Sequence, residues 1–114
     1  MRIMKLWIDD LRPAPKGYIW CHSVKEAKEH LVAGYMAYAI LLHRDANAPL
    51  PFELLDMDHD SGDYYKDGGD FIEILKWFEK TQTPCPPIRL HSMNPVGVQN
   101  MRAIIQHNGW TEVR

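Results

Sequence analysis

The chain has 114 residues, of which 46% are hydrophobic and 25% are charged, and this composition predicts a single domain with its own core over residues 1–114. The formal net charge of −2 excludes the broad basic field with which proteins grip long nucleic acids. No apolar run is long enough to span a membrane, and Cys21 and Cys85 fit no zinc or C-x-x-C spacing, so we expect a cytoplasmic protein with free thiols.

Three strands are predicted in the first half of the chain. Ile3–Ile8 is typical of a buried strand, and a loop rich in proline and glycine, Leu11–Gly17, follows it. Tyr18–His22 is predicted as a second strand because it is rich in β-forming residues. The turn-rich segment Asp45–Pro51 then precedes the third strand, Phe52–Met57.

A long helix is predicted between the second and third strands. Ser23 and Glu26 have the spacing of a capping box, which places the start of the helix at Ser23. The apolar stripe continues past Gly34, so the helix is expected to run to about Arg44. Its apolar residues at helical spacing are Val24, Ala27, Leu31, Tyr35, Tyr38 and Leu42. The pattern assigns no function to the segment Tyr35–Pro51.

The second half begins with a polar, glycine-rich segment, Ser61–Gly69, which predicts a loop at the edge of the site. Asp70 and Glu73 have capping-box spacing, so Asp70 is the predicted cap of a second helix. The core-facing residues of that helix are Phe71, Ile74, Leu75 and Phe78. A proline-rich turn, Thr81–Pro87, leads to the fourth strand, Ile88–His91.

A third helix and a short final strand complete the chain. Asn94 is a predicted N-cap before Pro95, and Asn108-Gly109 supplies the predicted end of the helix. Trp110–Val113 is predicted as the final strand. This order of elements predicts a small, mostly parallel sheet with helices on both faces. Right-handed crossovers then place the carboxyl ends of the first, third and fourth strands side by side.

Carboxylates follow two of these strands, at the edge where open α/β sheets bind ligands. Asp9-Asp10 comes directly after the first strand, and Asp58 comes directly after the third. Adjacent carboxylates repel each other unless a cation or an arginine compensates, and Mg²⁺ prefers carboxylate oxygens. We therefore expect Asp9, Asp10 and Asp58 to hold a divalent metal, Mg²⁺ or Mn²⁺. The alternative is that these aspartates cap loops or pair with Arg12.

Two histidines at the same edge are candidates for acid–base chemistry. His59 follows Asp58, and His91 ends the fourth strand, so both lie beside the proposed metal. Histidine is the residue type whose reference pKa lies nearest working pH, which suits it to the roles of general acid and base. Asp60 is placed to orient an imidazole. The alternative is that His59 is an ordinary polar loop residue, and Asp56 is open to a purely structural role.

Three further residues are candidates for binding phosphate. The planar guanidinium of Arg12 suits two phosphate oxygens at once. Ser92 and Asn94 lie between a strand and a helix N-terminus, where free backbone amides favour an anion. The alternatives are an ion pair of Arg12 with Asp9 or Asp10 and helix capping by Ser92 and Asn94. For Asn94 we favour the capping role.

Three segments resemble motifs of the cyclic-phosphate processing receiver-like domain family, and they occur in the same order. Leu6–Tyr18 resembles the opening of these domains. Met57-Asp58-His59-Asp60 is similar to their L-D-H-D-L-G segment. His91–Gly97, with Asn100-Met101 after it, resembles their H-S-x-N-P-x-G…N-M pattern. Together the three segments extend over most of the chain.

The resemblance implies a small flavodoxin-like, receiver-like three-layer α/β sandwich with a mostly parallel sheet. It also implies the processing of cyclic phosphates in nucleotide or RNA-end chemistry. With the residues above, we expect a metal-assisted phosphoesterase that acts on a small-molecule nucleotide or an RNA-end cyclic phosphate. We expect neither membrane binding nor an extended nucleic-acid surface.

Two other functions stay open at this point. A phosphoacceptor receiver domain also places acidic residues where Asp9, Asp10 and Asp58 lie. However, such a domain needs a late lysine, and no lysine follows Lys80, while His91 stands near a position where receivers use a small hydroxyl residue. We therefore rank signalling below phosphate chemistry. A module that binds a cyclic nucleotide without cleaving it uses the same residues.

Overall fold

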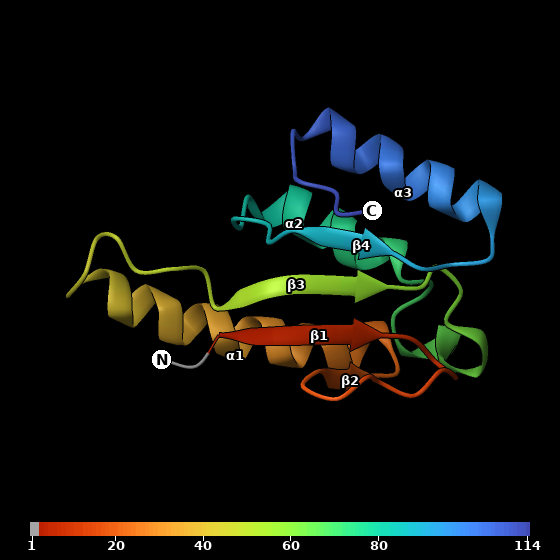
Figure 1. The fold of residues 1–114 in the computed structure, drawn as a ribbon, viewed down its shortest axis with the longest axis horizontal. Coiled ribbons are helices and arrows are strands. Elements are labelled where there is room, and N and C mark those ends of the chain that lie inside the picture. Colours follow the sequence, from red (N-terminus) through yellow and green to blue (C-terminus); the bar gives the residue numbers. More distant parts are fainter. Residues whose placement is uncertain (1–2) are drawn as a thin grey trace.

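The computed structural model describes residues 3–114, which form a parallel four-stranded sheet with helices packed against it (Figure 1). The sheet order is β2-β1-β3-β4, and the carboxyl ends of the strands point the same way. The strands are β1 (Met4–Ile8), β2 (Ile19–Cys21), β3 (Phe52–Met57) and β4 (Ile88–Leu90). The helices are α1 (Val24–Leu42), α2 (Ile72–Thr81) and α3 (Pro95–His107), with a short 3₁₀ helix η1 (Gly62–Asp67). The flavodoxin-like, receiver-like fold predicted from the sequence is confirmed.

Alternation along the strands separates an apolar face from a polar and aromatic one. Leu6 and Ile8 of β1 and Leu55 and Met57 of β3 are fully buried in the core. The residues between them point to the opposite face, where Trp7 pairs in register with Asp56. This second face leads directly to the carboxylates beyond the strands.

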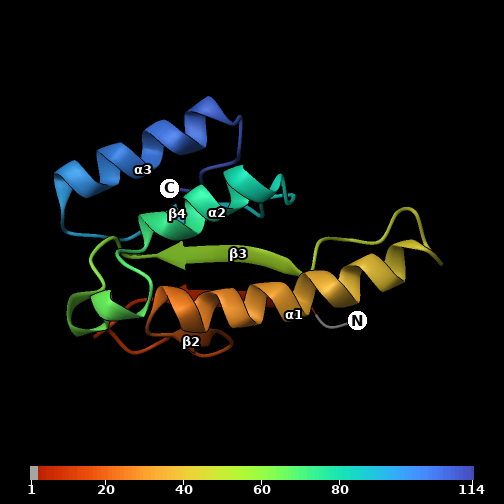
Figure 2. The same ribbon diagram turned by 180° about the vertical axis from the view of Figure 1, so that it is seen from behind.

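The two faces of the sheet are covered differently. Helices α1 and α2 lie behind the sheet in Figure 1 and in front of it in Figure 2, so they share one face. On the other face, where we also expected helices, the connection from β1 to β2 packs as a loop, with Tyr18 against Trp7 and Lys5. This crossover runs opposite to the others along the sheet, so right-handedness places it on this face. Pro13 and Pro15 keep it from forming a helix.

Helix α1 begins where the sequence predicts. The hydroxyl of Ser23 accepts a hydrogen bond from the backbone amide of Glu26 at 3.0 Å. The helix ends at Leu42, slightly before the predicted Arg44. Its second half extends past the strands (Figure 1), and Met36 and Ile40 are exposed there.

The prediction that Asp70 caps the second helix is wrong. Helix α2 begins at Ile72, and its N-cap is Phe71, which provides no side-chain cap. Asp70 instead accepts hydrogen bonds from the backbone amide and the hydroxyl of Ser61, at 3.1 and 3.3 Å. Ser61 is fully buried, so its polar groups need partners, and this requirement outweighs the local capping preference.

Two smaller differences concern the loops. The predicted loop Ser61–Gly69 contains the helix η1. The predicted final strand, Trp110–Val113, is reduced to a single bridge between Glu112 and Ile88. The carboxylate of Glu112 is bound by the guanidinium of Arg102 on α3, at 2.6 to 3.1 Å, which holds this segment against the helix.

Cys21 is buried, Cys85 is half-buried, and both are free thiols, as predicted. None of the helices in residues 3–114 combines the length and the apolar character of a membrane-spanning segment.

Candidate functional site

The sheet order brings the carboxyl ends of β1, β3 and β4 together at one edge. Ile8 and Met57 are paired in register, so Asp9 and Asp58 leave the sheet side by side, and the amide of Asp58 donates to the carbonyl of Ile8 at 2.8 Å. Carboxylate oxygens of Asp9, Asp10 and Asp58 lie within 4.8 Å of one another. The structure therefore assembles the three predicted metal ligands into one acidic cluster, defined here as Asp9, Asp10 and Asp58.

Asp9 is the anchor of the acidic cluster. It is fully buried, and its Oδ1 accepts hydrogen bonds from the backbone amides of Leu11 and Arg12 at 2.9 and 2.8 Å. Its Oδ2 lies 2.8 Å from Nε2 of His91. Burial raises the pKa of Asp9, but the two amides and the imidazole outweigh burial and hold the pKa below the ordinary 3.8. Asp9 is therefore a charged carboxylate in a fixed orientation.

Asp10 lies among other carboxylates. Burial, with repulsion from Asp9, Asp58 and Asp60, raises the pKa of Asp10 above the ordinary 3.8. Among residues 3–114, no basic side chain forms an ion pair with Asp10. Arg12 pairs with Asp9 and Asp58 instead. A bound cation would supply the missing positive charge.

Gly62 packs directly against Asp10. Its φ of +54° lies in the left-handed region, and a Cβ built there would stand 2.4 Å from Oδ2 of Asp10. Only glycine relieves both constraints, because it has no Cβ and adopts positive φ freely. The start of η1 is therefore fitted to the acidic cluster, a contact that the sequence pattern did not reveal.

Arg12 spans the ends of all three strands. Its Nε lies 3.4 Å from Oδ2 of Asp9, and one terminal nitrogen lies 3.7 Å from Oδ2 of Asp58. The other terminal nitrogen donates to the backbone carbonyl of His91 at 3.0 Å. The alternative of an ion pair with Asp9 is thus realised, and Asp58, rather than Asp10, is the second partner. The side chain remains 46% exposed, which leaves it accessible to a ligand.

His91 is held between two carboxylates. Its Nδ1 lies 2.7 Å from Asp56, and its Nε2 lies 2.8 Å from Asp9, so both ring nitrogens donate and the ring carries a positive charge. Burial lowers the pKa of His91, but these two hydrogen bonds outweigh burial and raise the pKa above the ordinary 6.5. The ring also stacks on Trp7, with centres 4.0 Å apart and planes 5° from parallel.

Asp56 and Trp7 are site residues that the sequence analysis did not assign. Asp56 is buried and also faces Arg89 at 3.5 Å, while Trp7 donates from its indole to the carbonyl of Arg12 at 2.8 Å. The available signal was alternation, because Asp56 and Trp7 each precede a cluster aspartate by two positions and so share its face.

His59 and Asp60 form a second group toward α3. Nδ1 of His59 lies 2.7 Å from Oδ1 of Asp60. The side-chain amide of Asn94 donates to the same oxygen at 3.1 Å. The bond to His59, with a smaller effect of Asn94, lowers the pKa of Asp60. Gly97 lies against the imidazole, where a Cβ would stand 2.4 Å from the ring. The ring of His59 is therefore fixed, and its Nε2 makes no hydrogen bond within the described part of the chain.

Asn94 and Ser92 have the capping contacts that the sequence left open. The side-chain oxygen of Asn94 accepts from the amide of Gly97 at 3.0 Å, which confirms Asn94 as the N-cap of α3. The hydroxyl of Ser92 accepts a hydrogen bond from the backbone amide of Asn94 at 3.1 Å. Both side chains therefore shape the loop between β4 and α3.

The two groups of the site are continuous. Oδ1 of Asp58 accepts the backbone amide of His59 at 2.7 Å, which joins the acidic cluster to the His59–Asp60 pair. Carboxylates dominate this edge, with Arg12 and His91 as the basic side chains that contact the acidic cluster. Such an arrangement attracts a cation and provides a guanidinium and an oriented imidazole beside it.

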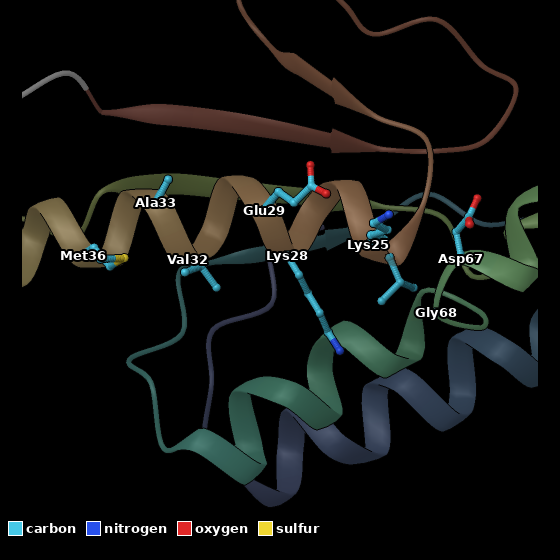
Figure 3. Close-up of a pocket in the computed structure, with 9 residues that line it drawn as sticks. Lys25, Lys28, Glu29, Val32, Ala33, Met36, Asp67 and Gly68 are labelled. Carbon is cyan, nitrogen blue, oxygen red and sulfur yellow. The ribbon is translucent and has the colours of Figure 1, made fainter.

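An open groove of about 720 Å³ lies elsewhere, along α1 (Figure 3). Val24, Val32 and Met36 give it apolar walls, and Asp67 and Gly68 close one side. None of the predicted site residues lines it.

The family described as the Cyclic-phosphate processing Receiver domain matches residues 4–107 of the chain. The match extends from β1 to the end of α3 and includes every candidate residue described above. No curated protein and no solved structure matches the chain.

Proposed function

The chain belongs to the family of the cyclic-phosphate processing receiver domain, and on this premise we propose that it is a metal-assisted phosphoesterase. Its proposed reaction opens a cyclic phosphate on a nucleotide or on an RNA end. The observation that supports the proposal most directly is the meeting of Asp9, Asp10 and Asp58 within 4.8 Å, beside Arg12. Ligands suited to a cation and a donor suited to a phosphate share this edge.

The acidic cluster fits a hard divalent cation such as Mg²⁺ or Mn²⁺. Carboxylate oxygens are the ligands these ions prefer, usually with several waters retained. Asp10 supports the fit because no basic side chain in residues 3–114 pairs with it. When bound, such an ion polarises a phosphoryl oxygen and makes a nearby water more acidic. Asp9, Asp10 and Asp58 are the proposed ligands.

Arg12 is the proposed phosphate-binding residue. Three of its five N–H donors contact Asp9, Asp58 and the carbonyl of His91, which leaves donors free for phosphate oxygens. These contacts also fix the plane of the guanidinium. Ser92 and Asn94 would contribute by shaping the loop at the start of α3 rather than by binding phosphate directly, because their side-chain oxygens are used for capping.

His59 is the proposed proton carrier. Because Asp60 accepts from Nδ1, the Nε2 atom is the nitrogen that takes a proton. A water oxygen forms a bond to phosphorus and loses its proton to Nε2. The ring P–O bond to the 2′ or 3′ oxygen then breaks, and that oxygen takes the proton from Nε2, which leaves a phosphomonoester and restores the imidazole.

His91 is assigned a positioning role in this proposal. Both of its ring nitrogens are occupied by Asp56 and Asp9, so neither is available to exchange a proton with substrate. Its charge instead holds Asp9 in place and links the ends of β1, β3 and β4. The acid–base work that the sequence predicts for His59 and His91 together is therefore proposed for His59 alone, with Asp60 orienting its ring.

The proposal is tested by incubating the protein with 2′,3′-cyclic AMP and with an RNA oligomer that ends in a cyclic phosphate. Samples contain Mg²⁺, Mn²⁺ or a chelator, and ³¹P NMR separates the cyclic diester from the monoester. We expect ring opening that needs the metal. His59→Ala should lower the rate about a hundred-fold, the size typical of general acid–base catalysis. The exposed His43 gives the matched control, His43→Ala, which should leave the rate unchanged.

Other results would assign the site differently. If the folded protein binds the ligand and returns it intact, it is a binding module. If acetyl phosphate labels the protein, and Asp58→Asn abolishes that label, the site is a phosphoacceptor. Either result without ring opening would contradict a phosphoesterase.

A further inference from the structure

Three aromatic side chains form a row at the edge of the acidic cluster. Trp20 stacks on His22, with ring centres 4.2 Å apart and planes 26° from parallel. His22 in turn contacts Tyr64, whose ring centre is 5.7 Å away. We define Trp20, His22 and Tyr64 as the aromatic row, which connects the end of β2 to η1.

One end of the aromatic row contacts the acidic cluster, and the other end lies on a helix whose first residue does so. The indole nitrogen of Trp20 donates to the backbone carbonyl of Asp9 at 2.6 Å. At the other end, η1 carries Tyr64 and begins at Gly62, which packs against Asp10. Figure 1 shows this short helix, in green, beyond the carboxyl ends of β1 and β3. A ligand held at the cluster therefore has the row within reach.

The row is held in place before any ligand binds. Glu26 accepts the backbone amide of His22 at 3.2 Å and lies 3.3 Å from its Nδ1. The amide of Tyr64 donates to the carbonyl of the buried Ser61 at 2.9 Å. Tyr64 nevertheless keeps 37% of its surface exposed, although burial of an aromatic side chain is favourable. A fixed, partly exposed aromatic ring is suited to stacking with a ligand.

We propose that the aromatic row is a stacking platform for the base of a nucleotide, with Tyr64 as the contact residue. This inference rests on the proposed function, and it names the substrate class as nucleoside cyclic phosphates rather than base-free cyclic phosphates. Every nucleobase offers a flat π-face, and aromatic side chains bind these faces in single-stranded RNA. The row contains neither lysine nor arginine, so it is suited to the base and not to the phosphate.

Two exposed side chains in the loops after β4 and β1, here called the other rim, provide a competing surface. Met93 is 85% exposed in the loop after β4, and Leu11 is 78% exposed in the loop after β1. These aliphatic side chains offer no π-face, and they are flexible. We therefore place the base on the aromatic row, and Met93→Ala serves to test the other rim.

The test compares the affinities of 2′,3′-cyclic AMP and of glycerol 1,2-cyclic phosphate, which has the five-membered ring but no base. Ligand-observed NMR gives both affinities in Mg²⁺ buffer, and ³¹P NMR follows ring opening in the same samples. We expect the nucleotide to bind about ten-fold more tightly or better, as base stacking typically gives. Tyr64→Leu should remove most of this preference, and Tyr64→Phe should keep it.

Tyr65 is the matched control, because it lies beside Tyr64 in η1 and is 63% exposed but makes no aromatic contact within residues 3–114. Tyr65→Leu and Met93→Ala should leave the preference unchanged. Equal affinity for the two ligands, or a preference that survives in a folded Tyr64→Leu variant, would overturn the platform. If the protein opens the cyclic phosphate of both ligands without preferring either, the platform is overturned but the phosphoesterase is supported. A Tyr64-dependent preference without ring opening would support the platform and contradict the phosphoesterase.

Discussion

At the scale of single residues, alternating charges connect the ends of the central strands. Asp56, His91 and Asp9 form a chain of two hydrogen bonds, each shorter than 2.9 Å, and Arg12 adds a second cation at Asp9. Breaking such a buried chain at one member leaves an uncompensated charge, which costs more than the pair itself contributes. The charge of His91 is therefore a structural element of this edge.

The raised pKa of His91 gives stability a defined pH dependence. Its folded-state pKa lies above the ordinary 6.5, so the stabilisation is complete below that value and is lost as pH rises through the folded-state pKa. The pKa of Asp9 is lowered, so its contribution is present above 3.8 and is lost only in acid. In chelator, the free energy of unfolding should therefore fall as pH rises above 6.5.

His91→Gln should be less stable near pH 6 and should lose much of this decline. Urea unfolding between about pH 5 and pH 9 measures both curves, and the exposed His43→Gln variant should follow the wild type. Parallel curves for wild type and His91→Gln would show that His91 is not a charged link.

Gly62 tests the fit between η1 and the acidic cluster. Gly62→Ala introduces both a left-handed strain and a Cβ only 2.4 Å from Asp10, whereas Gly17→Ala introduces strain alone, since nothing lies within 4 Å of its Cβ. Strain of this kind costs about 1–2 kcal/mol. We expect Gly62→Ala to lose more stability in urea than Gly17→Ala and, unlike it, to weaken Mn²⁺ binding. Equal effects of the two variants would contradict the fit.

The residues of the site were predictable to different extents. Asp9, Asp10, Asp58 and Arg12 were found because strand ends carry ligands in α/β sheets and because their residue types suit metal and phosphate. The two hydrogen bonds that hold His91 between Asp56 and Asp9 were not found. These partners lie in or directly after two other strands of the sheet, and the contacts depend on side-chain rotamers. Residue type identified the participants, but pairing required the three-dimensional register.

At the scale of elements, the start of α3 serves both the fold and the site. Asn94 caps the helix through its oxygen and binds Asp60 through its nitrogen. The helix start, the Asp60 carboxylate and the His59 ring are therefore positioned as one unit. Gly97 permits this closeness because a larger residue would displace the ring.

Asn94→Ala separates these two functions by comparison with Ser23→Ala, which removes the N-cap of α1. Loss of either cap should cost about 1 kcal/mol of unfolding free energy. Only Asn94→Ala should also slow ring opening, by several-fold, because Asp60 loses a hydrogen-bond donor and His59 loses its fixed partner. Equal rates in the two variants would place Asn94 outside the site.

Elements with strong periodicity were predicted well. The third strand, Phe52–Met57, is confirmed residue for residue, and α1 begins at its predicted cap. The predicted cap at Asp70 was wrong because the buried Ser61, which lies outside the helix, binds the same carboxylate. Caps are local signals, and a tertiary hydrogen bond outweighs them wherever a buried group needs a partner.

At the scale of the whole molecule, topology determines where the chemistry gathers. The connections from β2 to β3 and from β3 to β4 proceed in one direction along the sheet, while the connection from β1 to β2 goes the other way. The order β2-β1-β3-β4 therefore places β1 and β3 at the centre, with their carboxyl ends adjacent. This arrangement followed from the element order and right-handed crossovers alone. The replacement of a helix by a loop on one face did not follow from periodicity, because loops have none.

The most direct test of the central claim is the binding of Mn²⁺, followed by electron paramagnetic resonance of the free ion. The account predicts one saturable site per chain in the wild type. It also predicts that Asp10→Asn weakens binding ten-fold or more, while Asp63→Asn, which changes an exposed carboxylate in η1, leaves it unchanged. Binding that does not saturate, or equal affinities in wild type and Asp10→Asn, would contradict a metal site at the acidic cluster.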